Sequence, residues 1–158
     1  MQQQEFRRLA AELKNNLARL MDKRSTWESH WQECADFMQP RKAEINKERQ
    51  RGDKRNIQIF DATAIHASEL LAASLHGMLT SSANRWFQLR YKENLLNESD
   101  EAKEWLEDSI DKMYLAFARS NFQQEVFEVY HDLICFGTAC LMVEEDENDI
   151  IRFSSRHI

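Results

Sequence analysis

Glycine and proline are scarce in this chain, with three glycines and one proline among 158 residues. All-β proteins use these two residues in their many tight turns, so their scarcity argues against such a fold. Hydrophobic residues make up 42% of the chain, which is enough for one domain with a modest core. We therefore predict a mainly α-helical fold with a small β component (α+β), in which several amphipathic helices pack with a short β-hairpin.

The N-terminal segment, residues 3–21, carries large apolar side chains spaced like the seam of a short coiled coil. The seam predicts a helix, and two interpretations fit it equally well: packing on its own domain, or packing on another subunit. A second helix is predicted to start at Ser25 or Thr26, either of which can cap it, and to end before Pro40. The seam consists of Phe6, Leu9, Leu13, Leu17 and Leu20.

The rest of the chain is predicted to be organised around residues 57–91. Asp61 is a favourable helix N-cap, and Phe60 and Ile65 stand at the two positions of a hydrophobic staple around it. Residues 86–91 alternate between apolar and polar with period two, which predicts a strand. The predicted buried stripe of the helix is Ala64, Ser68, Leu71, Leu75 and Leu79; small residues that would admit another backbone are Ala67, Ala72, Ala73 and Ser74.

Two more helices and a hairpin are predicted beyond this stretch. One helix runs from about residue 99 to residue 120, and the next starts at Asn121, which resembles a capping box together with Gln124. Gly137 is placed to end that helix in a left-handed conformation. The hairpin is predicted to have strands at 138–143 and 150–153 around a charged turn at 145–149.

A basic segment interrupts an otherwise acidic chain. The net charge of the whole chain is −6, yet residues 41–55 hold seven basic and three acidic residues, a net +4. We interpret residues 41–56 as an exposed loop that is solvated, contacts phosphates of nucleic acid, or contacts an acidic neighbouring subunit. No aromatic residue is interspersed, so base stacking is not indicated. The basic residues are Arg41, Lys42, Lys47, Arg49, Arg51, Lys54 and Arg55.

Candidate catalytic and metal-binding residues are few. Glu128 and His131 form one Glu-x-x-His motif, whereas di-iron bundles need two of them. Glu125, Glu128 and Asp132 could hold a metal in principle, but their spacing is equally typical of a solvated helix face. With three glycines, the chain has no phosphate-binding loop and no nucleophile elbow. We predict no enzymatic activity, no metal and no cofactor.

The cysteines and the apolar runs indicate a reduced protein without membrane contact. Cys34, Cys135 and Cys140 form no CxxC pair and are predicted to be free thiols. The first residues lack the apolar core of a signal peptide. The longest apolar-leaning run, residues 133–143, is about half of the ~20 residues that a membrane-spanning helix needs.

Several motifs occur in the order found in one family of viral proteins. A tryptophan-containing helix before Pro40 is followed by the basic loop, by IFDATA and LLAASLHGMLT, by RWFQLRY, and then by SNFQQEVFEVYHDLICFGTACLMVEED and IIRFSSRHI. In this order, over residues 13–158, they resemble the N-terminal, wing part of the head-to-tail connecting (portal) proteins of short-tailed bacteriophages.

This resemblance implies a structural subunit of a homo-oligomeric, dodecameric ring at the portal vertex of the virion, assembled in the host cytoplasm. Such a ring passes viral DNA during packaging and ejection, and its implied partners are terminase, capsid or scaffold, and tail-adaptor proteins. Residues 1–158 would be one domain, without counterparts of the portal stem and clip. Because the sequence stops at Ile158, just after a predicted strand, we expect a fragment or a domain completed by another chain. The seam and residues 64–74 become candidate subunit-packing surfaces.

Two other functions stay open from the residues alone. A free-standing helical adaptor would bind nucleic acid through the loop at 41–55. Alanine at Arg49, Arg51, Lys54 and Arg55 would then weaken binding and flatten its salt dependence. An enzyme that used Glu128 and His131 would contain a bound transition metal.

Overall fold

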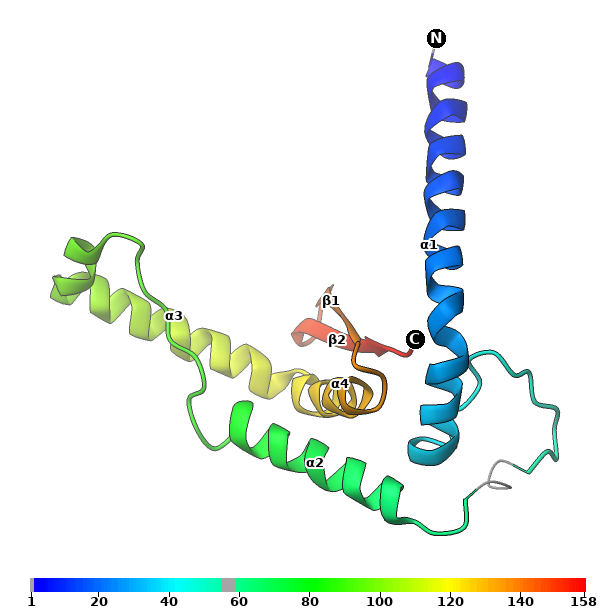
Figure 1. Ribbon diagram of the computed structural model, residues 1–158. Coiled ribbons are helices and arrows are strands. Elements are labelled where there is room, and N and C mark those ends of the chain that lie inside the picture. Colours follow the sequence, from blue (N-terminus) through cyan, green and yellow to red (C-terminus); the bar gives the residue numbers. More distant parts are fainter. Residues whose placement is uncertain (1, 55–58) are drawn as a thin grey trace. The chain divides into compact units, whose positions relative to one another are not determined.

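The computed structural model describes residues 2–54 and 59–158 (Figure 1). The chain divides into two compact units, Met1–Ile65 and His66–Ile158. Helices predominate, and a two-stranded antiparallel sheet is the β component of the described residues. The predicted mainly α fold with a small β part is therefore confirmed. That residues 1–158 make one domain stays a prediction.

The first unit is built on one long helix, α1, which spans Gln2–Met38 without interruption (Figure 1). The predicted break at Ser25 or Thr26 is therefore wrong. The hydroxyls of Ser25 and Thr26 donate to the carbonyls of Asp22 and Lys23 at 2.7 and 3.0 Å. Serine and threonine can make such bonds to the preceding turn inside a helix, so their capping preference does not force an end here. The helix does stop before Pro40, as predicted.

Helix α2 spans Thr63–Leu79, so Asp61 stands one residue before the N-cap position that was predicted for it, although its side chain still bonds to the start of the helix. The Asp61 carboxylate accepts from the backbone N–H of Thr63 at 2.8 Å, and this bond lowers the pKa of Asp61. The predicted hydrophobic staple does not form, because Phe60 is 96% exposed. A capping bond can fix the start of a helix without any apolar contact across it.

The buried side of α2 is rotated from the predicted stripe. Ser68 and Ala72 are buried, and Leu75 and His76 are half-buried. Three members of the predicted stripe are exposed, namely Ala64, Leu71 and Leu79. The cause is that α2 is apolar on most of its circumference, so hydrophobicity alone does not select which side faces its neighbour.

The predicted strand at 86–91 is absent, and these residues are extended without a strand partner. The backbone N–H groups of Trp86 and Phe87 donate instead to the hydroxyl of Tyr114, at 2.6 and 3.0 Å. The predicted alternation of buried and exposed side chains is nevertheless present, because Phe87, Leu89 and Tyr91 are half-buried between exposed neighbours. A segment whose apolar and polar residues alternate can thus pack along a helix, although the same pattern in a sequence predicts a strand. A short 3₁₀ helix, Asn94–Glu98, follows.

Helices α3 (Asp100–Arg119) and α4 (Phe122–Phe136) lie close to their predicted positions. Gly137 ends α4 with a φ of 71°, and its N–H donates to the carbonyl of Leu133. This left-handed exit confirms the prediction. The predicted capping box at Asn121 is wrong, because the side chain of Asn121 makes no cap bond and bonds to Phe153 instead.

The predicted hairpin is confirmed as β1 (Cys140–Asp146) and β2 (Ile150–Arg156), paired antiparallel with Val143 opposite Phe153. It lies against α4 (Figure 1). The core of the second unit gathers where the hairpin meets the start of α4. Its buried members are Phe122, Val126 and Phe153, and Phe117, Tyr130, Leu141 and Ile151 pack against them.

Candidate assembly surfaces

The basic segment after α1 is folded back onto the end of that helix by Gln32. The Gln32 amide nitrogen donates to the carbonyl of Ala43 at 3.0 Å. Its amide oxygen accepts from the N–H groups of Ile45 and Asn46 at 3.0 and 3.1 Å. Gln32 is only 2% exposed, so these bonds form out of water. One buried side chain therefore fixes the course of three loop residues.

Asp36, one helical turn after Gln32, anchors the next part of the loop. Its carboxylate accepts from Lys47 Nζ at 2.8 Å and from Arg49 Nη2 at 2.6 Å. Burial by itself would raise the pKa of Asp36, but the bonds from Lys47 and Gln32 and the two positive charges outweigh it and lower the pKa. The carboxylate therefore stays ionised in a largely buried place because two cations surround it.

The seven basic residues predicted as a contact set are not equivalent. Lys47 and Arg49 turn toward Asp36, and Lys42 is half-buried. Arg41, Arg51 and Lys54 are exposed, whereas Arg55 lies outside the described residues. What the loop touches in a partner stays a prediction. An open cavity of about 720 Å³, lined in part by Gln32, Asp36 and Lys47, adjoins its folded part.

The predicted seam forms an apolar stripe along α1, which we call the α1 stripe. Every residue of α1 from Gln3 to Lys23 is exposed, so no other described residue of the first unit packs over this half of the helix. The five side chains lie on one side of the helix, as their spacing of three or four residues requires. Its members are Phe6 (74% exposed), Leu9 (53%), Leu13 (60%), Leu17 (57%) and Leu20 (57%).

A second uncovered apolar surface lies on α2, on the side away from α4. The inner side is fixed to α4 by polar and aromatic contacts. Ser68 lies 3.5 Å from His131, and the hydroxyl of Tyr130 donates to Thr80 at 3.2 Å. Glu69 is the one Asp, Glu, Lys or Arg in the helix. The uncovered side, which we call the α2 outer face, consists of Ala67, Leu70, Leu71, Ser74 and Met78, all exposed.

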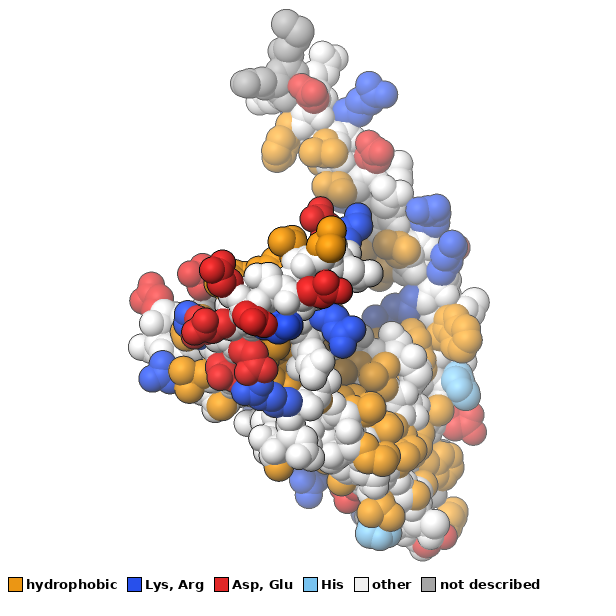
Figure 2. All heavy atoms as spheres, turned by 90° about the vertical axis from the view of Figure 1, so that its left-hand side faces the viewer, with side chains coloured by type: hydrophobic (Ala, Val, Ile, Leu, Met, Phe, Trp, Pro, Cys, Tyr) orange, Lys and Arg blue, Asp and Glu red, His pale blue; other side chains and the backbone are white. Residues whose placement is uncertain are grey.

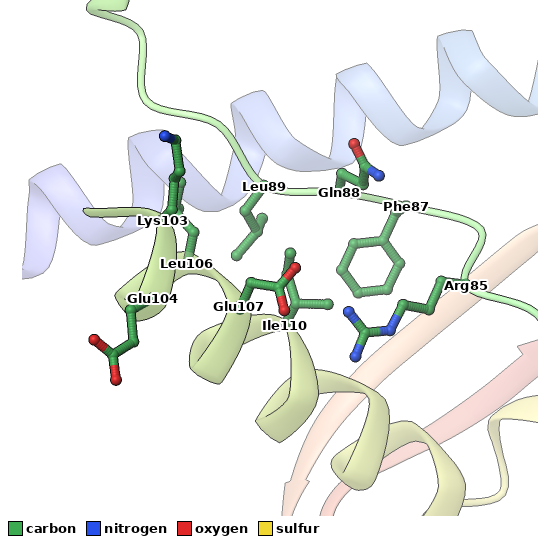
Figure 3. A pocket seen from close by; sticks show the side chains of 9 residues that line it. All are labelled: Arg85, Phe87, Gln88, Leu89, Lys103, Glu104, Leu106, Glu107 and Ile110. Atoms are coloured by element: carbon green, nitrogen blue, oxygen red, sulfur yellow. The ribbon is translucent and has the colours of Figure 1, made fainter. Parts of the chain in front are cut away.

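A hollow of about 330 Å³ lies between the extended segment 85–89 and α3 (Figure 3). Phe87, Leu89 and Ile110 point into it. Arg85 stands at one end and forms an ion pair with Asp111 of α3. The hollow thus combines an apolar floor with charged residues at its rim. It was not predicted, because it depends on segment 85–89 lying along a helix.

Three of the polar residues considered for catalysis contact different structural partners. Glu125 accepts from the backbone N–H of Ser155 at 2.6 Å. Asp132 is 2% exposed and lies 3.8 Å from the ring of His157, while His131 approaches Ser68. Over residues 2–54 and 59–158, no three His, Cys, Asp or Glu side chains are grouped so that they could hold a metal ion.

Charge is distributed unequally between the two units. Met1–Ile65 contains thirteen basic and ten acidic residues, a net +3, and His66–Ile158 contains eight basic and seventeen acidic residues, a net −9. Figure 2 shows acidic side chains gathered on the face that it presents, with hydrophobic ones exposed beside them. None of the described helices is both long and apolar enough to span a bilayer.

The sequence reasoning missed the two anchors of the loop, Gln32 and Asp36. A weak signal for them exists: a glutamine and an aspartate stand four residues apart just before a basic segment, on one side of a helix. The pattern does not show which of seven cations the aspartate selects. Only the folded loop brings Lys47 and Arg49, rather than Arg51 or Lys54, to the carboxylate.

Comparisons with known proteins agree on one family. The model of the bacteriophage head to tail connecting protein family matches residues 10–158. The portal protein of Salmonella phage epsilon15 is 34% identical over 141 residues, which cover 89% of this chain and 25% of that protein. A probable portal protein of Bordetella phage BPP-1 is 35% identical over 133 residues, covering 84% of this chain and 24% of that protein. This chain thus spans about a quarter of the length of these relatives. It belongs to the family of bacteriophage head-to-tail connecting proteins.

Proposed function

We propose that this chain is the wing part of a portal subunit that assembles into a dodecameric homo-oligomeric ring without enzymatic activity. The observation that carries the proposal is the α1 stripe, five large apolar residues that are each more than half exposed. Helices in proteins owe most of their stability to the packing of an apolar face. A surface of this kind on a family member is expected to be covered in the assembled protein.

In the proposed ring, viral DNA passes through during packaging and ejection. Terminase, capsid or scaffold, and tail-adaptor proteins dock onto the ring, which forms in the host cytoplasm and ends at the portal vertex of the virion. The names of the two relatives support this placement. The acidic net charge of −6 is compatible with a conduit that must let DNA slide, because walls of like charge do not retain it.

The test replaces two members of the α1 stripe by charged residues. Leu13→Glu with Leu17→Glu in the full-length protein is expected to abolish rings in negative-stain electron micrographs and to leave a smaller species in light scattering. Both side chains are exposed, so the fold of the subunit should survive, which circular dichroism checks.

The matched control is Ala11→Glu with Ala18→Glu, two exposed positions on the opposite side of the same helix. This variant adds the same charge and should still form rings. Rings from the Leu13 and Leu17 variant would remove the α1 stripe from the interface. Absence of rings from the unaltered protein would contradict the proposed function as a whole.

The basic loop is proposed as a secondary contact, with an acidic neighbouring subunit or with phosphate. Arg51 and Lys54 carry this contact, because both are exposed whereas Lys47 and Arg49 bind Asp36. Alanine at Arg51 and Lys54 should leave assembly intact if the loop meets DNA, and should lower both DNA affinity and its salt dependence. The same variant should instead weaken ring assembly if the loop meets a subunit.

A further inference from the structure

The extended segment 86–91 carries backbone groups that have no hydrogen-bond partner. The hydroxyl of Tyr114 binds the start of the segment, and the side-chain amide of Asn97 binds its end. Between these two anchors, the N–H and C=O groups of residues 88–90 make no hydrogen bond to any described residue. A β-strand is the natural complement of such groups, because it can bond to them along its length.

The hollow of Figure 3 lies beside these groups. Phe87 and Leu89 of the segment and Ile110 of α3 point into it. In a strand that paired with the segment, every second side chain would point to the same side as Phe87 and Leu89. Main-chain bonds would then hold the strand, and the apolar floor would favour an apolar side chain at the position above it.

Strand β1 has an open edge that can supply such bonds. Phe153 of β2 directs both of its backbone groups to Asn121, away from β1. Opposite residues of an antiparallel pair exchange both hydrogen bonds or neither, so Val143, which stands opposite Phe153, also directs its N–H and C=O away from the hairpin. No described residue of the second unit bonds to these groups of Val143. Helix α4 thus closes one edge of the hairpin, and the other edge stays open.

The side chains of β1 suit the hollow and the segment beside it. Met142 and Val143 are 38% and 59% exposed, so this open edge carries apolar side chains in water. Long exposed apolar edges pair readily with other strands, and natural proteins usually cover them. An apolar residue of β1 therefore gains burial if it enters the hollow.

Charged residues next to both backbones are complementary. Glu144 and Glu145 of β1 are exposed, and so are Arg90 and Lys92 at the end of the segment. None of these four side chains forms an ion pair with a described residue. Opposite charges on neighbouring strands stabilise their pairing, and like charges weaken it. Pairing of β1 with the segment is therefore favoured over pairing of either with its own kind.

The two backbones do not meet within the second unit of one copy. The segment is held on α3, because Arg85 pairs with Asp111 and Phe87 stacks on Tyr114 with centroids 4.6 Å apart. In this unit β1 contacts β2 and α4 but not α3. Both backbones therefore need a partner from outside this arrangement.

A second copy of the chain offers each of them the partner that it lacks. In a cyclic ring every interface joins two different surfaces, one from each neighbour. We propose, on the basis of the proposed ring, that β1 of one copy pairs with segment 86–91 of the adjacent copy. An apolar side chain of β1 enters the hollow, and the glutamates that follow it lie near the basic end of the segment.

The experiment cross-links two differently tagged populations of the full-length protein after they assemble together. One carries Gln88→Cys and the other Glu144→Cys, both with Cys34→Ser and Cys140→Ser, and a short bis-maleimide joins nearby thiols. Paired residues of neighbouring strands have Cβ atoms about 5 Å apart. A covalent pair between the two tags is therefore the expected product.

Two control mixtures keep the same chemistry and move one cysteine. The first replaces Gln88→Cys by Glu101→Cys, an exposed position at the start of α3. The second replaces Glu144→Cys by Gln124→Cys, an exposed position on α4. The expected yield is several-fold higher for Gln88→Cys with Glu144→Cys than for either control.

A proline on β1 tests the backbone bonds directly. Val143→Pro removes an N–H that faces away from β2, and proline is tolerated at such positions of an edge strand. The variant should keep its circular dichroism spectrum and lose ring assembly. Val143→Thr is the matched control, because it keeps the N–H and the branched side chain, and it should still form rings. If Val143→Pro does not fold, the cross-linking yields decide.

The remaining outcomes overturn the proposal. Equal yields in all mixtures, from particles that still form rings, exclude the pairing and leave the proposed ring in place. Normal rings from folded Val143→Pro do the same. Links found only within single chains that carry both cysteines would show that each copy pairs its own segment and strand. If the unaltered protein forms no rings, the proposed function and this inference both fall.

Discussion

The side-chain amide of Asn121 makes with Phe153 the two hydrogen bonds that a neighbouring strand would make. Its Nδ2 donates to the carbonyl of Phe153 at 2.8 Å, and its Oδ1 accepts from the N–H of Phe153 at 2.9 Å. Four residues on, Glu125 accepts from the N–H of Ser155. The start of α4 thus closes the outer edge of β2, which would otherwise offer unpaired backbone groups to other chains.

Replacing Asn121 should therefore destabilise the second unit. Asn121→Ala leaves the N–H and carbonyl of the buried Phe153 without these partners, and we expect a loss of about 1–3 kcal/mol in the free energy of unfolding. Urea titration followed by circular dichroism measures it. Gln124→Ala is the control, because Gln124 is an exposed residue of the same helix and alanine suits a helix there. A loss as large in the control would show that Asn121 does not act through β2.

The hydroxyl of Tyr114 should stabilise the extended segment 85–91 on α3. It accepts from the N–H groups of Trp86 and Phe87, while the ring of Tyr114 stacks on Phe87 with centroids 4.6 Å apart. Tyr114→Phe keeps the ring and removes the acceptor, so we expect a loss of about 1 kcal/mol and faster hydrogen exchange at Trp86 and Phe87. Tyr91→Phe, which keeps the stack on Trp105, should leave exchange at these two amides unchanged.

The features that the sequence predicts correctly are those that a residue determines through its own backbone properties. Pro40 and Gly137 end helices through their own backbone properties, and the structure confirms both. Asn121 shows the limit of this reasoning. Asn121 stands where a capping box is expected, yet its side chain bonds to a residue 32 positions away. The backbone groups at the edge of β2 need partners more than the solvated first turn of α4 does.

The same limit applies to the two candidate surfaces, of which only one could be predicted from the sequence. Periodicity located the α1 stripe, since the spacing of Phe6 to Leu20 fixes one side of any helix. It did not locate the α2 outer face, because on an apolar helix only the partner selects the buried side. The anchoring of Lys47 and Arg49 by Asp36 depends on pairs 11 and 13 residues apart, which composition does not reveal.

The turn of the hairpin stores strain at Ile150. Its φ is +73°, a conformation that a β-branched residue rarely adopts and that costs roughly 1–2 kcal/mol. Because Ile150 is 54% exposed, Ile150→Asn loses little burial and should raise the free energy of unfolding by about 1 kcal/mol or less. Val143→Asn, on the paired strand and also exposed, should lower it. Equal losses in both variants would show that strand propensity outweighs the strain.

Asp36 should make the attachment of the basic loop depend on pH. Its pKa is lowered in the folded protein by Lys47, Gln32 and Arg49, against the effect of burial. A carboxyl whose folded pKa lies below its unfolded value contributes its full stability above the unfolded value, about 3.9 for aspartate. This contribution disappears as the pH falls through the folded pKa, when the protonated carboxyl no longer attracts the two cations.

Two variants isolate this effect. Asp36→Asn should lower the urea midpoint at pH 7 and flatten its decrease between about pH 5 and pH 2, since the variant has no proton to take up there. It should also speed tryptic cleavage after Lys47 and Arg49, whose side chains lose their anchor. Asp53→Asn is the matched control, a carboxylate of the same loop that accepts from the N–H of Gln50, and cleavage at these two sites should keep its rate. If Asp36→Asn left both the acid slope and the cleavage rate unchanged, the loop would be fixed by Gln32 alone.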